Sequence, residues 1–257
     1  MATNFGSELK QWRTTRRFSQ LDLSAEADVS SKHISFLESG RSKPSREMVI
    51  HLAETLNIPK SERNRLLTAA GFASKYVVND LSSEAMRPIR SALSWTMERH
   101  NPYPGFVLDR HWNIVDANET ALAMLNLMGQ PTSLSMLDLL LGDTGLRDCV
   151  TNWDEVSLYL LARLRTENEH LGGDPIFESS IEQLRTLQGD ISIDHDRPSN
   201  PMVAIELAIG DLRLSMLSSI AAFGASNDFA LADLKIELFF PADEPTRLFL
   251  ERLTTKP

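Results

Sequence analysis

The chain has 257 residues, which is more than one compact core usually needs, and its 42% hydrophobic and 24% charged residues are ordinary for a globular protein. It has no run of about eighteen apolar residues that would cross a bilayer and no apolar signal segment at the amino terminus, and its single cysteine, Cys149, excludes a disulfide framework. We therefore expect a cytoplasmic protein of two domains with no membrane segment.

The charge of the chain is divided unevenly between its two ends. Residues 1–76 carry a net charge of +4 and residues 77–257 carry −13, so that the whole chain carries −9. A basic head on an acidic body is typical of a module that binds a polyanion, attached to a domain that does not. We predict a first domain over 1–72, a polar linker over 73–83 and a second domain over 84–257.

The first seventy residues show the spacing of five short helices. Apolar residues recur at helical intervals from Phe5 to Trp12, and Ser19 and Ser30 are candidate N-caps for the second and third helices. Two more helices are expected before residue 71. Only a few residues around Asp28 separate the second helix from the third, which predicts two helices joined by a tight turn.

The segment SQLDLSAEADVSSKHISFLESGRSKPSREMVIHLAETLNI resembles the xenobiotic-response-element and phage-repressor helix-turn-helix family. It has Ser then Gln at the second helix start, Ile followed by Leu-Glu in the recognition helix, and Gly after that helix. It departs from the family at Asp28, where Gly is usual, but Asp tolerates the left-handed backbone that the turn needs. The resemblance also implies a structural ion pair between Arg13 and Glu38.

In this family the recognition helix lies in the major groove of double-stranded DNA, and two copies usually pair on inverted half-sites. The resemblance implies that Ser31, Lys32 and Phe36 read bases: Ser31 by hydrogen bonds, Lys32 by donating to guanine and Phe36 by packing on a thymine methyl. His33 either contacts a phosphate or lies in solvent. The basic pair Arg16-Arg17 is equally compatible with a solvated face. The implied phosphate contacts come from Gln20, Ser39, Arg41, Lys43 and Arg46.

The remainder of the chain predicts an α+β domain. Helical periodicity and turn residues place helices at 84–100, 118–127, 134–141, 153–170, 177–187 and 244–253. Alternating or β-prone runs place strands at 105–108, 112–115, 202–209, 212–223 and 234–240. The first two strands form a hairpin and the last three a meander, so we expect a five-stranded antiparallel sheet of PAS-like type with helices over one face.

This second domain resembles the ligand-binding domain of MmyB-like regulators. The resemblance is carried by NPYPGFVLDRHWNIVDAN, with Pro104 and Asn118, and by WDEVSLYLLARLRTE, with Trp153 and Arg165. The carboxyl-terminal strands match less well, because SNPMVAIEL stands where the family tends to have His-Pro and a Gly. The resemblance implies a PAS-like pocket for a long apolar ligand such as a fatty acid, with no cofactor.

Candidate residues of that pocket are large apolar side chains on elements expected to face the sheet, together with two polar residues of the matched segments. The same apolar residues are also compatible with a filled core, and Arg165 is either a partner for a ligand carboxylate or a surface residue. The candidates are Trp95, Phe106, Trp112, Asn118, Met124, Leu125, Leu137, Trp153, Arg165 and Phe223.

Two other function classes compete with this interpretation. The cluster Asp194-His195-Asp196 has the residue types of a metal or acid–base site, but it lies in a polar loop without partners at ligand spacing, and no HExxH, GxSxG or phosphate-loop motif is present. We therefore expect no catalysis. The other alternative is a body that binds a partner protein instead of a small molecule, and an apolar molecule co-purifying with the chain would separate the two.

Overall fold

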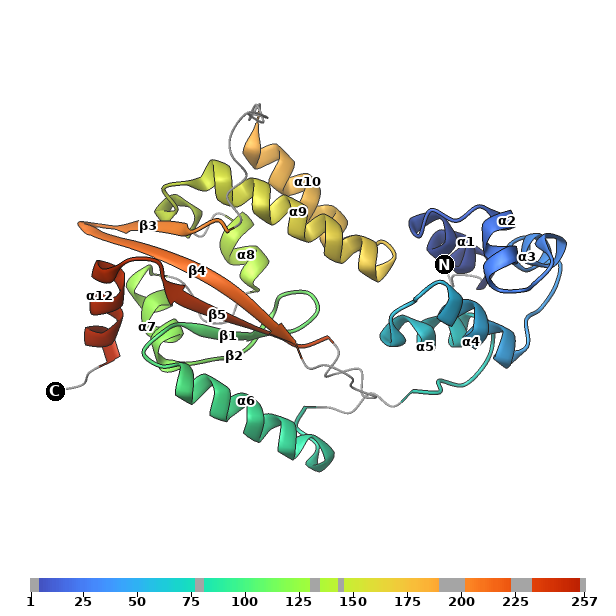
Figure 1. The fold of residues 1–257 in the computed structure, drawn as a ribbon, viewed down its shortest axis with the longest axis horizontal. Helices are drawn as coiled ribbons and strands as arrows, with labels where there is room; N and C mark the ends of the chain where they lie inside the picture. The colour runs from blue at the N-terminus through green and yellow to red at the C-terminus, as the bar shows by residue number, and fades with distance from the viewer. Residues whose placement is uncertain are drawn as a thin grey trace. The chain divides into compact units, whose positions relative to one another are not determined.

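A computed structural model describes residues 5–76, 81–129, 135–142, 146–189, 202–222 and 233–254. The described chain divides into two compact units (Figure 1): the first takes in residues up to 76 together with Arg165–Glu178, and the second takes in the remainder. This division differs from the sequence-based one in its assignment of Arg165–Glu178. None of the described helices combines the length and the hydropathy that a membrane span requires.

Hydrogen bonds within the first unit explain that assignment. The Gln11 side-chain amide donates to the Gly172 carbonyl oxygen over 2.9 Å, and the Arg16 guanidinium donates to the carbonyl oxygens of Glu169 and His170 over 2.6 and 2.9 Å. Gly172 has a φ of +80°, and a Cβ there would lie 2.5 Å from the Trp12 ring. Glycine is therefore required at this position both for its backbone and for the close approach.

The first unit begins with five helices that follow the expected order. Serine N-caps set the starts of three of them: the Ser19 side chain accepts from Asp22 N in a capping box, Ser30 accepts from His33 N, and Ser45 accepts from Met48 N. The helices are α1 (Phe5–Thr15), α2 (Gln20–Glu26), α3 (Ser31–Glu38), α4 (Arg46–Thr55) and α5 (Lys60–Ala69).

The turn between α2 and α3 has the backbone that the sequence predicts. Asp28 adopts a φ of 49°, the left-handed conformation expected where the family usually has glycine. Ile34 and Leu37 of α3 are buried in the core of the head with Trp12 of α1. Apolar burial from one side therefore holds α3 and leaves its other side exposed.

The predicted ion pair is confirmed at the carboxyl end of α3. The Arg13 guanidinium donates to both oxygens of Glu38, over 2.6 and 3.1 Å, and only 9% and 4% of the two side chains are exposed. Arg13 also donates to the Phe18 carbonyl, and Gln20 donates its side-chain amide to Glu38 over 2.8 Å. This network ties α1, the start of α2 and the end of α3 together.

The second unit is built on a five-stranded antiparallel sheet in the order β2-β1-β5-β4-β3. The predicted sheet is confirmed, including the meander of its last three strands. The strands are β1 (Gly105–Leu108), β2 (Ile114–Ala117), β3 (Ile205–Ile209), β4 (Leu212–Ala222) and β5 (Lys235–Pro241). The helices are η1 (Glu84–Met86), α6 (Arg87–His100), α7 (Glu119–Leu127), α8 (Met136–Leu141), η2 (Arg147–Cys149), α9 (Trp153–Leu171), α10 (Pro175–Gln188) and α12 (Glu244–Thr254).

The two faces of the sheet are covered by different helices, whereas the sequence predicted helices over one face. Val107 and Ile236 pair across β1 and β5, and they pack with Leu93 and Met97 of α6. The alternate residues of both strands point to the opposite face, as strand geometry requires. Helices α8 and α9 lie on that side of the sheet (Figure 1), and the pocket described below lies between the sheet and α7, α8 and α9.

The first hairpin also differs in detail from its prediction. Trp112 was expected to open the second strand, but it has a φ of 63°, and β2 begins at Ile114. Asp109 shapes the turn, because its carboxylate accepts from the backbone N–H groups of His111 and Asn113. The left-handed residue turns the Trp112 ring inward, and only 1% of it is exposed.

Candidate nucleic-acid interface and ligand pocket

The start of α3 presents the side chains that the sequence predicts as base readers. Ser31 and Lys32 are exposed, His33 and Phe36 are partly exposed, and Ile34 is fully buried. Because residues three and four apart share a helix face, Lys32 and Phe36 form one surface while Ile34 anchors the other. The recognition helix therefore offers its amino-terminal turn and the turn after it to a partner.

Two cations flank the ring of Phe36. The Lys32 ammonium lies 5.6 Å from the ring centroid and the Arg41 guanidinium lies 5.9 Å from it. The Phe36 carbonyl oxygen also accepts from the backbone N–H of Arg41 over 2.9 Å, where the chain turns after Gly40. An aromatic ring with two positive charges near it suits the edge of a base beside its phosphate backbone.

The side chains predicted to contact phosphates differ in their exposure and in whether they already make a hydrogen bond. Ser39, Arg41 and Lys43 are exposed, and Arg46 is partly exposed in the first turn of α4. Gln20 is held by its hydrogen bond to Glu38, which positions its amide at the start of α2. These assignments stay predictions.

The basic pair Arg16-Arg17 divides into two different environments. The Arg16 guanidinium donates to the carbonyl oxygens of Leu56 and Asn57, and it stacks over the Trp12 ring at 5.2 Å. Burial lowers the pKa of Arg16. Arg16 therefore serves the fold by binding the carbonyls that end α4, whereas Arg17 is exposed.

In the second unit a pocket lies between the sheet and α7, α8 and α9. About 970 Å³ of space lies among its side chains, and this volume includes space that is open to solvent. Nearly all of its wall is apolar, and four methionines give the wall adaptable side chains. The apolar residues that line it are Pro104, Phe106, Trp112, Ala121, Met124, Leu125, Met128, Met136, Leu140, Leu146, Val150, Val156, Tyr159, Leu160, Val203, Ile205, Leu207, Met216 and Phe239.

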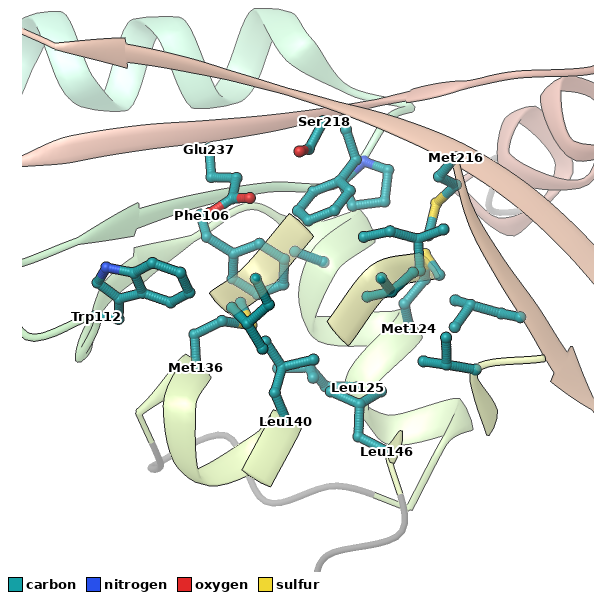
Figure 2. A pocket seen from close by; sticks show the side chains of 18 of the residues that line it. Phe106, Trp112, Met124, Leu125, Met136, Leu140, Leu146, Met216, Ser218 and Glu237 are labelled. Carbon is teal, nitrogen blue, oxygen red and sulfur yellow. The ribbon is translucent and has the colours of Figure 1, made fainter. Parts of the chain in front are cut away.

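A few polar groups gather on the strand side of this pocket. Figure 2 shows Glu237 and Ser218 along the strands, with Trp112 at one end and Leu140 on the helical side. The Arg163 guanidinium donates to both Glu237 oxygens over 3.0 and 3.2 Å, and its carbon lies 3.9 Å from the Trp112 ring centroid. The pocket is therefore a hydrocarbon cavity with one charged pair in its wall.

The structure brings four of the ten predicted pocket residues together at this cavity. Phe106 comes from β1, Trp112 from the hairpin turn, and Met124 and Leu125 from α7. Leu137 of α8 is buried but does not line the cavity, and Phe223 lies outside the described residues.

The other predicted pocket residues are placed elsewhere. Trp95 is wrong as a lining residue: it is 61% exposed, because α6 packs on the opposite face of the sheet through Leu93 and Met97. Trp153 packs at the edge of the core without reaching the cavity. Arg165 points to solvent, although it was considered as a carboxylate partner.

Asn118 is a structural residue in this fold. Its side-chain oxygen accepts from the backbone N–H groups of Gly105 and Ala121, and its amide donates to the Tyr103 carbonyl over 2.7 Å. These bonds cap α7 and join it to β1. Asn118 does not line the pocket.

The sequence contained a signal for the charged residues that were missed. Val156, Leu160 and Arg163 follow one another at four and three residues along α9, so they share its inner face, whereas Arg165 does not. Glu237 is the one acid in the largely apolar strand LKIELFF, and a carboxylate in such a run needs a partner where it is buried. Neither the position of Arg163 on its helix nor that of Glu237 on its strand shows by itself that the two form an ion pair.

One potential nucleophile, Cys149, lies among the residues that the structure describes. Burial, together with the charge of Asp148, raises the pKa of the Cys149 thiol, so this cysteine is not an activated nucleophile at neutral pH. Among the described residues, no three His, Cys, Asp or Glu side chains gather as metal ligands would. The cluster Asp194-His195-Asp196 lies outside the described residues.

Comparison with known families gives two matches that together cover most of the chain. Residues 89–253 match the MmyB-like transcription regulator ligand binding domain, and residues 6–71 match a helix-turn-helix domain. Comparison with curated proteins gave no match. The solved structure of an RNA-binding Light-Oxygen-Voltage receptor aligns with 97% of this chain, at 10% identity and a TM-score of 0.29, and the chain spans 62% of that structure's length.

Proposed function

Because the chain belongs to the MmyB-like transcription regulators, with their ligand-binding domain behind a helix-turn-helix domain, we propose that it binds specific DNA sequences and responds to a small apolar molecule. The observation that carries the DNA-binding part is the exposed surface of α3, where Lys32 and, from the loop after the helix, Arg41 lie close to the Phe36 ring. Residues 1–76, which include this surface, carry a net charge of +4. We expect it to act in the cytoplasm, where its DNA lies. We propose no reaction and no cofactor for it.

The exposed residues of the head have two separate tasks in this proposal. Ser31, Lys32 and Phe36 read base edges in the major groove, because a lysine can donate to guanine and an aromatic ring can pack on a thymine methyl. The phosphate contacts position the domain without specifying sequence. Those positioning residues are Gln20, His33, Ser39, Arg41, Lys43 and Arg46.

One such domain reads only a few base pairs, so we propose that the protein acts as a homodimer on inverted half-sites. Selection of bound fragments from genomic DNA, followed by footprinting, tests both parts of this proposal. Two protected half-sites about one helical turn apart are the expected result. A monomer in solution that protects a single asymmetric site would contradict it.

The pocket supports the ligand part of the proposal. Its lining is almost wholly apolar, which suits the hydrocarbon chain of a molecule such as a fatty acid. Each buried methylene of such a chain contributes about 0.8 kcal/mol, so a tenfold change in DNA affinity, which needs about 1.4 kcal/mol of unequal binding to two states, is within reach.

Native mass spectrometry and solvent extraction of the purified protein test this part directly. We expect a bound apolar molecule, and we expect removing it or adding it back to change operator affinity. A folded protein that carries no such molecule, binds no added acyl chain and keeps one operator affinity would replace the ligand proposal with the alternative of a protein-interaction module.

A further inference from the structure

We propose that the pocket selects an apolar molecule whose polar head is uncharged, such as an aliphatic alcohol, over the free carboxylate of the same chain length. The inference rests on the proposed ligand-sensing function and specifies its ligand class. It follows from the charged pair in the pocket wall, Arg163 and Glu237, whose members neutralise each other.

The geometry of this pair is that of a completed contact. Arg163 Nη1 lies 3.0 and 3.2 Å from the two oxygens of Glu237, and Nη2 lies 3.2 Å from one of them. Only 10% and 7% of the two side chains are exposed. The guanidinium plane also stacks on Trp112, which is itself buried. Arg163 is thus held by Glu237 and by Trp112, and it would have to give up these contacts to bind the head of a ligand.

A carboxylate head would meet this pair unfavourably. If it approached Arg163, it would place a second negative charge beside Glu237 in an apolar cavity, where like charges repel strongly. If it displaced Glu237, it would leave a buried carboxylate without its partner, which is strongly destabilising. An ammonium head would meet the mirror-image problem at Arg163. A charged head group on the ligand, whether negative or positive, is therefore repelled by one member of the pair.

Lys235 is a further cation near this end of the pocket. It lies two residues before Glu237 on the same face of β5, with its ammonium 5.9 Å from the Trp112 ring centroid. It does not line the pocket. A carboxylate within the cavity would therefore have Arg163 and Glu237 as its immediate charged neighbours.

An uncharged hydroxyl fits the same wall without disturbing the pair. A carboxylate has about four lone-pair sites, so Glu237 can accept a hydroxyl proton while it keeps Arg163. The Ser218 hydroxyl lies on the strand side of the cavity with Glu237 (Figure 2) and can donate or accept. The hydrocarbon chain then lies along the apolar side chains that make up most of the wall, among them four methionines and five leucines.

Three probes with the same ten-carbon chain separate head charge from chain burial: 1-decanol, decanoate and decylammonium at pH 7.5. Calorimetric titration of the full, lipid-extracted protein should show decanol binding at least tenfold more tightly than either ion. Because this comparison uses the unmodified protein, its result does not depend on whether a substituted protein folds.

Glu237→Gln keeps the shape of the side chain and removes its charge, leaving Arg163 to pair with an added anion. We expect the preference to shift toward decanoate by at least tenfold, with the fold checked by circular dichroism. Arg165→Gln, an exposed arginine on the same helix, is the matched control and should leave all three affinities unchanged.

The outcomes distinguish this inference from the proposed function. Decanoate binding as tightly as decanol in the unmodified protein would overturn the inference and leave ligand sensing intact. A folded Glu237→Gln variant with the original preference would also overturn it. If none of the three probes binds, ligand sensing itself fails together with this inference.

Discussion

Removal of the Glu38 carboxylate is the most direct test of how the head holds its recognition helix. In Glu38→Ala the Arg13 guanidinium, whose side chain is only 9% exposed, loses its charge partner, and Gln20 loses its acceptor. Breaking one side of a buried pair costs about 3–5 kcal/mol, because an uncompensated charge stays inside. This is a large part of the roughly 5–15 kcal/mol that stabilises an ordinary domain.

The double variant Arg13→Met with Glu38→Leu removes both charges and is the matched control. Arg13 also donates to the Phe18 carbonyl oxygen, which would lose that donor at a cost of about 1 kcal/mol. Apolar side chains of similar length restore much of the packing. We therefore expect the double variant to lose less than about 2 kcal/mol, which is less than the single variant loses.

Amide hydrogen exchange on peptides from α1 and α3 of the full chain measures these local free energies. The single variant should lower protection by about two to four orders of magnitude, which corresponds to about 3–5 kcal/mol. If protection fell less than tenfold, or if the double variant lost as much as the single one, the ion pair would not be what positions α3.

Three further predictions concern DNA, packing and the pocket. Lys32→Ala should cost about 1–3 kcal/mol at the preferred site only, whereas Arg46→Ala should weaken all sequences alike and lower the salt slope; identical behaviour in binding titrations would refute this division. Gly6→Ala should destabilise the head by about 1–3 kcal/mol in urea, because a Cβ there would lie 2.5 Å from the backbone oxygens at the end of α3. Leu140→Trp should fill the pocket and weaken decanol binding at least tenfold with the melting temperature retained, whereas Leu122→Trp, on an exposed position of α7, should not.

The head was predictable from sequence because its signals are local. Ser19, Ser30 and Ser45 each cap a helix through the backbone N–H three residues on, and Asp28 takes the left-handed backbone of its own turn. The spacing of apolar residues within a single helix then predicts which side of that helix is buried. The Arg13–Glu38 pair joins distant residues, and it was predicted from family resemblance, not from local pattern.

The sheet of the second unit was predictable for the same reason, since a run of β-prone residues between turns marks a strand wherever it pairs. Its boundaries moved where a single residue took an unusual backbone, as at Trp112. The position of α6 was not readable from its sequence: its periodicity shows an apolar side, but not which face of the sheet that side covers.

Five head helices, the turn between α2 and α3 and five antiparallel strands could be predicted from the sequence, because each depends on residues that are neighbours along the chain. Packing in three dimensions sets which apolar residues line a cavity and which face solvent, since Phe106 and Trp95 are both large and aromatic but lie on different surfaces. It also decided that Arg163, and not Arg165, reaches the pocket, and that its partner is Glu237, 74 positions away. Such a contact depends on the packing of α9 over β5, which no local pattern along the chain encodes.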